Sequence, residues 1–299
     1  MAKWGHASCF TPAITHGRTN GKNPILFSAL LWYISATMNK QGNVYFVGAG
    51  PGAADLITVR GANLLSGAEL VIYAGSLVDR QLVQTYAGQA QIYDSSGMAL
   101  TEIITVMLDA VAAGQKVVRL HTGDPSVYGA IQEQMEALDR LGIGYEVVPG
   151  VTSAFAAAAA LKQELTLPEV SQTIIITRME GRTPVPEREA LRHLATHGAT
   201  LALYLSVGMI ETMVQELLAG GAYTAATPVA VVSRATWPDE LIVEGCLADI
   251  AGKVQSAGIT KQAMILVGDA LGAWRQGMKA RSLLYDETFS HGCREGTVA

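Results

Sequence analysis

The chain has 299 residues, of which 49% are hydrophobic and 16% are charged, and its formal net charge is −5. This length and composition are typical of ~2 ordered domains with a large apolar core, which excludes an intrinsically disordered protein. The negative net charge argues against nucleic acid as a partner, so an acidic ligand must meet a local basic cluster.

The N-terminal part of the chain contains an apolar run at residues 25–38. A membrane span needs about 20 apolar residues, whereas this run has 14 and is interrupted by Ser and Thr. A signal peptide also has a basic start and an apolar middle, but no clear A-x-A cleavage site follows this run. We therefore expect Met38 to be the functional start, no membrane attachment, and a poorly ordered extension over residues 1–42.

From residue 44 onward, short β-branched segments alternate with helical patterns. Each segment is mostly apolar and ends in glycine or a small polar residue, as strands buried on both faces do. Helices are predicted at 100–113 and 126–141. These features predict an α/β domain over residues 43–160 with a largely parallel sheet and a site at its strand ends. Its predicted strands are 44–50, 69–75, 91–96, 116–123 and 145–150.

A second α/β domain is predicted over residues 161–272, followed by a tail over 273–299. Its last three strands are separated by short connections or one helix, which favours an antiparallel pair and a mixed sheet. An alanine-rich helix at 154–160 leads out of the first sheet, and a ligand is expected in the cleft between the two domains. The predicted strands are 172–179, 199–207, 228–235, 240–247 and 263–269.

The three cysteines are Cys9, Cys246 and Cys293, which are far apart in the sequence. No CxxC pair and no HExxH motif is present, so we predict neither a disulfide framework nor a metal site. Cysteine usage of this kind is typical of a protein in the reducing cytoplasm.

The first glycine-rich loop, Gly48–Gly52 (GAGPG), directly follows a predicted strand. A dinucleotide site would need G-x-G-x-x-G and an acidic residue after the next strand, and neither is present. Pro51 also removes an amide donor that a pyrophosphate would use. A plain tight turn explains this loop about as well as a ligand does.

Two further glycine-rich loops follow predicted strands, at 121–129 (HTGDPSVYG) and 148–153 (VPGVTS). Asp124 or Ser126 can cap the next helix, or Asp124 can accept a hydrogen bond from a ligand, and both interpretations stay open. Thr152 and Ser153 are expected to cap the alanine-rich helix. Three such loops at one sheet edge are more than capping requires.

In this order and spacing, the motifs resemble the tetrapyrrole (corrin/porphyrin) methylase family from about Asn43 to Gly268. The segments 73–77 (YAGSL), 177–186 (TRMEGRTPVP) and 233–240 (SRATWPDE) are similar to the branch that methylates carbon 11 of precorrin-4 or its cobalt form. Ala74 replaces an aspartate that is usual in the uroporphyrinogen-methylating branch.

The resemblance implies a cytoplasmic homodimer that binds S-adenosylmethionine between its two domains and takes a tetrapyrrole substrate. The implied cofactor contacts are Pro51, Thr122, Gly123, Asp124, Val127, Thr152, Ser153, Leu205, Arg234, Ala235 and Ala263. No catalytic side chain is expected, because a sulfonium methyl group is already activated and the protein has only to align the reactants and exclude water.

The carboxylates of such a substrate would be held by Arg178 and Arg182, since arginine forms forked bonds to carboxylates. Glu180 would hold a ring N–H or pair with a neighbouring arginine. Trp237 and Tyr204 could pack on the macrocycle, although core packing is the simpler role for Tyr204. Without the resemblance, a solvated basic loop is the simpler explanation of these arginines. The alternatives are methylation of another corrin carbon, a non-catalytic binding module, and a dinucleotide-dependent oxidoreductase.

Overall fold

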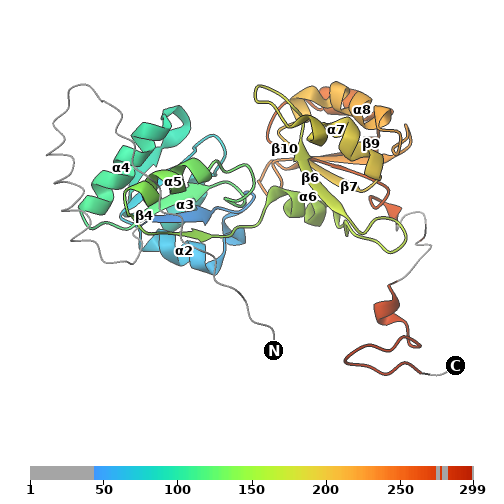
Figure 1. The fold of residues 1–299 in the computed structure, drawn as a ribbon, viewed down its shortest axis with the longest axis horizontal. Helices are drawn as coiled ribbons and strands as arrows, with labels where there is room; N and C mark the ends of the chain where they lie inside the picture. Colours follow the sequence, from blue (N-terminus) through green and yellow to red (C-terminus); the bar gives the residue numbers. More distant parts are fainter. Residues whose placement is uncertain (1–43, 274–276, 278–281, 298–299) are drawn as a thin grey trace, which may run out of the picture. The chain divides into compact units, whose positions relative to one another are not determined.

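The computed structural model describes residues 44–273, 277 and 282–297. The expected extension 1–42, with its apolar run, lies outside the described residues. All ten predicted strands are present, and they form two five-stranded sheets (Figure 1). None of the helices in the described part of the chain is long and apolar enough to cross a membrane.

The first sheet is parallel throughout, with the strand order β3-β2-β4-β1-β5. Its connections run through α2 (Val59–Ser66), α3 (Arg80–Tyr86), α4 (Leu100–Ala112) and α5 (Gln132–Arg140). The strands are β1 (Val44–Gly48), β2 (Leu70–Tyr73), β3 (Gln91–Asp94), β4 (Val117–His121) and β5 (Tyr145–Val148). The predicted parallel sheet is therefore confirmed.

The two faces of the first sheet differ because side chains alternate along each strand. Val118 and Leu120 of β4 pack in one apolar cluster with Leu65 of α2 and Leu82 of α3. Arg119, between those two residues in β4, is on the opposite face and reaches α5. Helices therefore cover both faces, which is why these strands are almost continuously apolar.

The second sheet is mixed, with the order β6-β7-β10-β8-β9. β6 and β7 are parallel, whereas β10 is antiparallel to both β7 and β8, and β8 is antiparallel to β9. The strands are β6 (Ile174–Arg178), β7 (Thr200–Tyr204), β8 (Pro228–Ser233), β9 (Leu241–Cys246) and β10 (Ala263–Val267). The predicted mixed sheet is confirmed.

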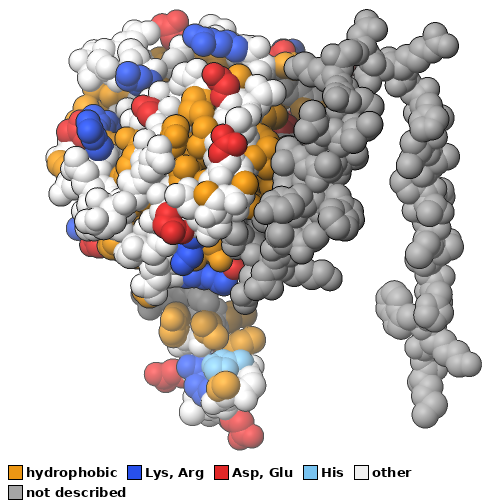
Figure 2. All heavy atoms as spheres, turned by 90° about the vertical axis from the view of Figure 1, so that its left-hand side faces the viewer, with side chains coloured by type: hydrophobic (Ala, Val, Ile, Leu, Met, Phe, Trp, Pro, Cys, Tyr) orange, Lys and Arg blue, Asp and Glu red, His pale blue; other side chains and the backbone are white. Residues whose placement is uncertain are grey.

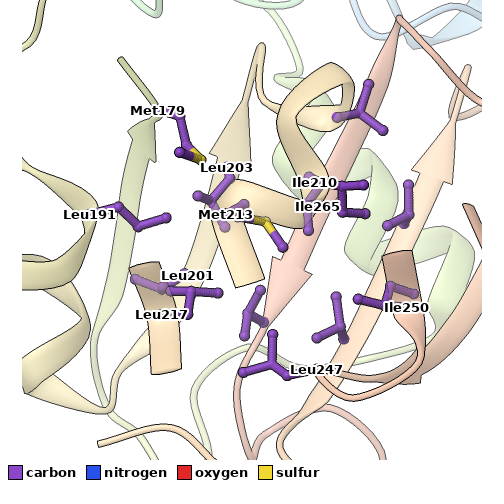
Figure 3. Packing of buried hydrophobic residues seen from close by; sticks show 14 of the residues in the cluster. Met179, Leu191, Leu201, Leu203, Ile210, Met213, Leu217, Leu247, Ile250 and Ile265 are labelled. Carbon is purple, nitrogen blue, oxygen red and sulfur yellow. The ribbon is translucent and has the colours of Figure 1, made fainter. Parts of the chain in front are cut away.

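The part of the chain that forms the first sheet is called the first half here, and the part that forms the second sheet the second half. One face of the second sheet carries the larger core of the second half, which Figure 3 shows from close by. Leu201, Leu203 and Ile265 point from the strands toward Met213 and Leu217. The covering helices are α7 (Leu191–Leu194), α8 (Ile210–Ala219) and α9 (Ile250–Ser256).

The opposite face is covered by the alanine-rich helix α6 (Ser153–Leu161), which packs on Ala202, Ala230 and Leu266. Small side chains on both surfaces allow this helix to approach the strands closely. The helix that follows the last strand of the first sheet thus packs on the second sheet.

The helix predicted over 126–141 is shorter than expected, because α5 begins only at Gln132. Tyr128 and Ala130 have φ angles of 56° and 48°, and left-handed residues cannot continue a right-handed helix. Residues 125–128 form a turn instead. Of the two interpretations left open, the one in which Asp124 or Ser126 caps a helix at this point is therefore wrong.

On the face of the molecule drawn in Figure 2, acidic and basic side chains are interspersed among hydrophobic ones. The basic side chains that are drawn in colour on that face lie in several separate places.

Candidate functional site

The three glycine-rich loops of the first half lie at one edge of the first sheet. They follow β1, β4 and β5, which are neighbours in a parallel sheet, so their carboxyl ends meet at the same edge. In the strand order, the connection after β1 runs past β4 to β2, and the connection after β4 runs past β1 to β5 in the opposite direction. Adjacent strands whose connections run in opposite directions form a topological switch point, where open α/β sheets bind ligands.

The backbones of these loops are packed directly on one another. Gly50 N donates to Gly123 O at 3.2 Å, and Gly123 N donates to Gly50 O at 2.8 Å. A Cβ atom on Gly150 would lie 2.1 Å from Gly123 O, and one on Gly48 would lie 2.6 Å from it. These glycines are therefore required by the packing of the loops themselves, whether or not a ligand is near.

Asp124 joins two of these loops through its carboxylate. Oδ1 accepts from Ser126 N at 2.8 Å, and Oδ2 accepts from Gly150 N at 2.9 Å. A carboxylate has about four lone-pair positions, so each oxygen can still accept a further hydrogen bond. Asp124 fixes the shape of the edge and keeps acceptor capacity for a ligand.

Thr152 does not cap α6 with its side chain, which corrects the sequence-based expectation. Its hydroxyl instead bonds to the hydroxyl of Tyr204, at the end of β7 in the second sheet. Ala154 N also donates to that hydroxyl, at 3.3 Å. The centroids of the Tyr128 and Tyr204 rings lie 5.3 Å apart. Tyr204 therefore ties two first-half segments to the second sheet.

The second-sheet candidates also lie at one edge. Leu205 follows β7, Arg234 and Ala235 follow β8, and Ala263 begins β10. Because β10 is antiparallel to β7 and β8, its first residue pairs with Ser233, the last residue of β8. Strand direction thus brings these residues together although they are far apart in the sequence.

This second edge has an unusual backbone. Residues with a side chain rarely adopt positive φ, yet Leu205, Arg234, Thr236 and Gln262 have φ angles of 54°, 51°, 69° and 53°. Such conformations cost roughly 1–3 kcal/mol each and are often found at ligand-binding sites. Leu205 is also 70% exposed, which is unusual for a leucine that follows a buried strand.

Hydrogen bonds link the two edges directly. Trp237 Nε1 donates to Pro51 O at 3.0 Å, and Ala53 N donates to Thr236 Oγ1 at 2.9 Å. Gln262 Nε2 donates to Ser76 O at 2.6 Å. The predicted cofactor residues of the two halves therefore lie on facing, hydrogen-bonded edges.

Three residues of this junction, Thr236, Gln262 and Ser76, were not singled out from the sequence. Thr236 and Gln262 are ordinary polar residues. Nothing in their sequence neighbourhood indicates that they contact loops more than 180 residues away. Thr236 and Ser76 lie within the family-like segments SRATWPDE and YAGSL, but neither segment indicated these contacts.

Arg234 has a donor suited to a ligand. Its guanidinium lies 4.4 Å from the centre of the Trp237 ring, and NH1 contacts Asp239 at 2.6 Å. Its Nε is buried and has no hydrogen-bond partner within the described ranges. A buried donor without a partner costs stability unless something else satisfies it, so this atom fits a ligand acceptor.

The predicted substrate residues lie on the loop after β6. Arg178 donates from NH1 to the carbonyls of Met179 and Thr183, each at 3.1 Å, and from NH2 to that of Pro184 at 2.8 Å. Arg178 thus organises its own loop, while Glu180 and Arg182 on that loop are exposed. The loop offers Arg182 to a ligand more freely than Arg178.

Two ionisable groups are buried beneath the loop after β4. Burial lowers the pKa of Arg119 to about 10, and its guanidinium donates to Gln134 Oε1 at 3.2 Å and Ile72 O at 3.3 Å. Burial, aided by the Arg119 charge, lowers the pKa of His121 to about 3. His121 is therefore neutral at physiological pH and does not act as an acid there.

Comparison with known proteins adds the family. Residues 43–251 match the model of the tetrapyrrole (corrin/porphyrin) methylases. A cobalt-precorrin-4 C(11)-methyltransferase of Methanocaldococcus jannaschii is 54% identical over 258 residues, which cover 86% of this chain and 98% of that protein. A precorrin-4 C(11)-methyltransferase of Mycobacterium tuberculosis is 51% identical over 231 residues, covering 77% and 92%.

Solved structures agree with this. An X-ray structure of a cobalt precorrin-4 methyltransferase matches with a TM-score of 0.74 at 51% identity, covering 76% of this chain and 95% of that one. A uroporphyrin-III C-methyltransferase of Thermus thermophilus, complexed with S-adenosylhomocysteine, matches with a TM-score of 0.64 at 32% identity, covering 77% and 98%. By its sequence motifs, its two sheets and these similarities, the chain belongs to the tetrapyrrole (corrin/porphyrin) methylase family.

Proposed function

We propose that this protein transfers the methyl group of S-adenosylmethionine to carbon 11 of precorrin-4 or cobalt-precorrin-4, a step in building the corrin ring of cobalamin. The observation that carries the proposal is the 54% identity to a cobalt-precorrin-4 C(11)-methyltransferase, over 98% of the length of that protein. The family membership favours this activity over a dinucleotide-dependent oxidoreductase. The protein is thus an S-adenosylmethionine-dependent C-methyltransferase.

The cofactor site is proposed at the two facing edges, between the two sheets. The first edge contributes Pro51, Thr122, Gly123, Asp124, Val127, Thr152 and Ser153, and the second contributes Leu205, Arg234, Ala235 and Ala263. Three features support this placement: the switch point of the first sheet, the positive φ angles of the second edge, and the buried Nε of Arg234.

S-adenosylmethionine supplies a methyl group that its positively charged sulfur already activates. The residues of the chain therefore have only to bind, orient the two reactants and exclude water.

The substrate is proposed to lie against the loop after β6, where Arg182 pairs with an acetate or propionate carboxylate. Arg178 holds the loop in shape through its bonds to three carbonyls. Glu180 is exposed on the same loop and is available to a ring N–H.

The direct test is an assay of purified protein with S-adenosylmethionine and precorrin-4, with and without cobalt. We expect mass spectrometry to show one added methyl group and NMR to place it on carbon 11. A methyl group on another carbon would support the alternative acceptor position. Binding of NADH, with no binding of S-adenosylhomocysteine in calorimetry, would overturn the proposal.

The family resemblance also supports a homodimer in the cytoplasm. Sedimentation velocity measures the mass of the assembly, which can be compared with the 31.5 kDa of one chain. We expect a species of twice that mass, and a single species at the mass of one chain would contradict the homodimer.

A further inference from the structure

The segment Thr236–Trp237 of the second half holds the Pro51–Ala53 loop of the first half at successive points. The indole N–H of Trp237 donates to Pro51 O at 3.0 Å, and the Thr236 hydroxyl accepts from Ala53 N at 2.9 Å. One segment therefore satisfies an acceptor on one side of Gly52 and a donor on the other.

Gly52, between those two contacts, leaves the space that the indole needs. A Cβ atom there would lie 2.2 Å from Trp237 Cδ1 and 2.5 Å from its Nε1. Contacts of that length do not occur, so any side chain at this position would displace the ring. The last glycine of the GAGPG loop is thus explained by a contact within the protein.

The holding segment is itself strained and braced. Arg234 and Thr236 both have positive φ angles, of 51° and 69°. Arg234 N donates to Gln262 O at 2.9 Å, and Thr236 N donates to Glu240 Oε2 at 2.6 Å. The Arg234 guanidinium lies against the Trp237 ring, a favourable cation–π arrangement. A conformation that costs energy persists only where its surroundings enforce it.

We propose that Thr236 and Trp237 are positioning residues for the cofactor site: they hold the Pro51–Ala53 loop in the conformation that binds S-adenosylmethionine. In this role they act through their hydrogen bonds to the loop. The affinity of the Pro51–Ala53 loop for the cofactor therefore depends on contacts made by the second half. This inference rests on the proposed cofactor site, and in particular on Pro51 as a cofactor contact.

Two variants remove one hydrogen bond each, Thr236→Val at nearly constant shape and Trp237→Phe with a smaller ring. Trp237→Phe keeps an aromatic ring against Arg234 but has no N–H, and Thr236→Val keeps the β-branched shape but has no hydroxyl. One lost hydrogen bond corresponds to about a tenfold change in an equilibrium constant. We expect the Kd for S-adenosylhomocysteine, measured by calorimetry, to rise about tenfold in each variant. Thr236→Ser, which keeps the acceptor oxygen, should bind within about threefold of the wild type.

A matched control separates positioning from general loss of stability. Tyr223→Phe removes a buried hydrogen bond to Ala199 O, within the core of the second half. It should lower the melting temperature and leave the Kd unchanged. Trp237→Phe should raise the Kd even at temperatures where circular dichroism shows it fully folded.

Gly52→Ala provides a second, steric test that does not depend on the hydrogen bonds. We expect it to weaken binding more than tenfold in the wild-type background and by a smaller factor when combined with Trp237→Ala, because the ring is then absent and only the contact with Thr236 Oγ1 at 2.9 Å remains. If the wild type binds S-adenosylhomocysteine and both Trp237→Phe and Thr236→Val bind it with the same Kd, this inference alone is overturned. Failure of the wild type to bind S-adenosylhomocysteine would overturn the proposed cofactor site itself.

Discussion

Replacement of Gly150 by alanine tests whether the three strand-end loops depend on direct backbone packing. A Cβ atom at this position would lie 2.1 Å from Gly123 O, so the two loops have to move apart by about 1.3 Å to reach an ordinary contact of 3.4 Å. Gly150 does not have a positive φ, so the cost is steric and not conformational.

The size of the effect follows from two contributions. Overpacking typically costs about 1–3 kcal/mol. Separation of the loops also weakens the hydrogen bond from Gly150 N to Asp124 Oδ2, and a bond to a charged group contributes about 1.5–3 kcal/mol. We expect Gly150→Ala to lower the free energy of unfolding by about 4 kcal/mol and to weaken S-adenosylhomocysteine binding at least tenfold.

The assay is urea unfolding followed by circular dichroism, with calorimetric titration of each folded variant. Gly252→Ala is the matched control, because it makes the same substitution at an exposed position of helix α9, with nothing within 4 Å of the new Cβ. It should stabilise the protein by about 0.5–1 kcal/mol, since alanine favours helix more than glycine does. Equal stability of Gly150→Ala and the wild type would refute the packing explanation.

Further predictions concern other parts of the site. Because the folded pKa of His121 is about 3 and its ordinary value is 6.5, the unfolded chain binds more protons between those values and stability falls with decreasing pH. From pH 7 to pH 5 we expect wild type to lose about 2 kcal/mol more than His121→Gln in urea unfolding, and parallel pH profiles would contradict this. Tyr204→Phe removes the hydroxyl that bonds to Thr152 and Ala154, and should lower the unfolding free energy by about 1–2 kcal/mol. An unchanged urea midpoint would argue against those bonds. Arg182→Ala should raise the substrate KM about tenfold at unchanged Kd for S-adenosylhomocysteine, whereas an unchanged KM would exclude Arg182 from substrate binding.

The sequence predicted the strands well because each one is a short, mostly apolar segment, and most of them end in glycine or a small polar residue. It predicted the helix after Asp124 less well. The helical pattern of 126–141 was real from Gln132 onward, but the left-handed Tyr128 and Ala130 interrupt it. Nothing in the sequence marks this tyrosine or this alanine as left-handed, because residues with a side chain rarely adopt that conformation.

Capping also depended on distant contacts. Thr152 is well placed by sequence to cap α6, yet its hydroxyl bonds to Tyr204 from the other half of the molecule. Local rules assign such a hydroxyl to the nearest backbone N–H. A partner that lies fifty-two residues away is not visible to them.

By itself, the sequence determined the two sheets, the three glycine-rich loops and the family to which their order belongs. Those features are local: strand periodicity, turn residues and motif spacing are all read within a few neighbouring residues. Only the tertiary structure decided how the two edges meet, with Trp237 on the Pro51 carbonyl and Gln262 on the Ser76 carbonyl. Those contacts join residues 186 positions apart, and they form only because strand order and direction bring both edges to one place.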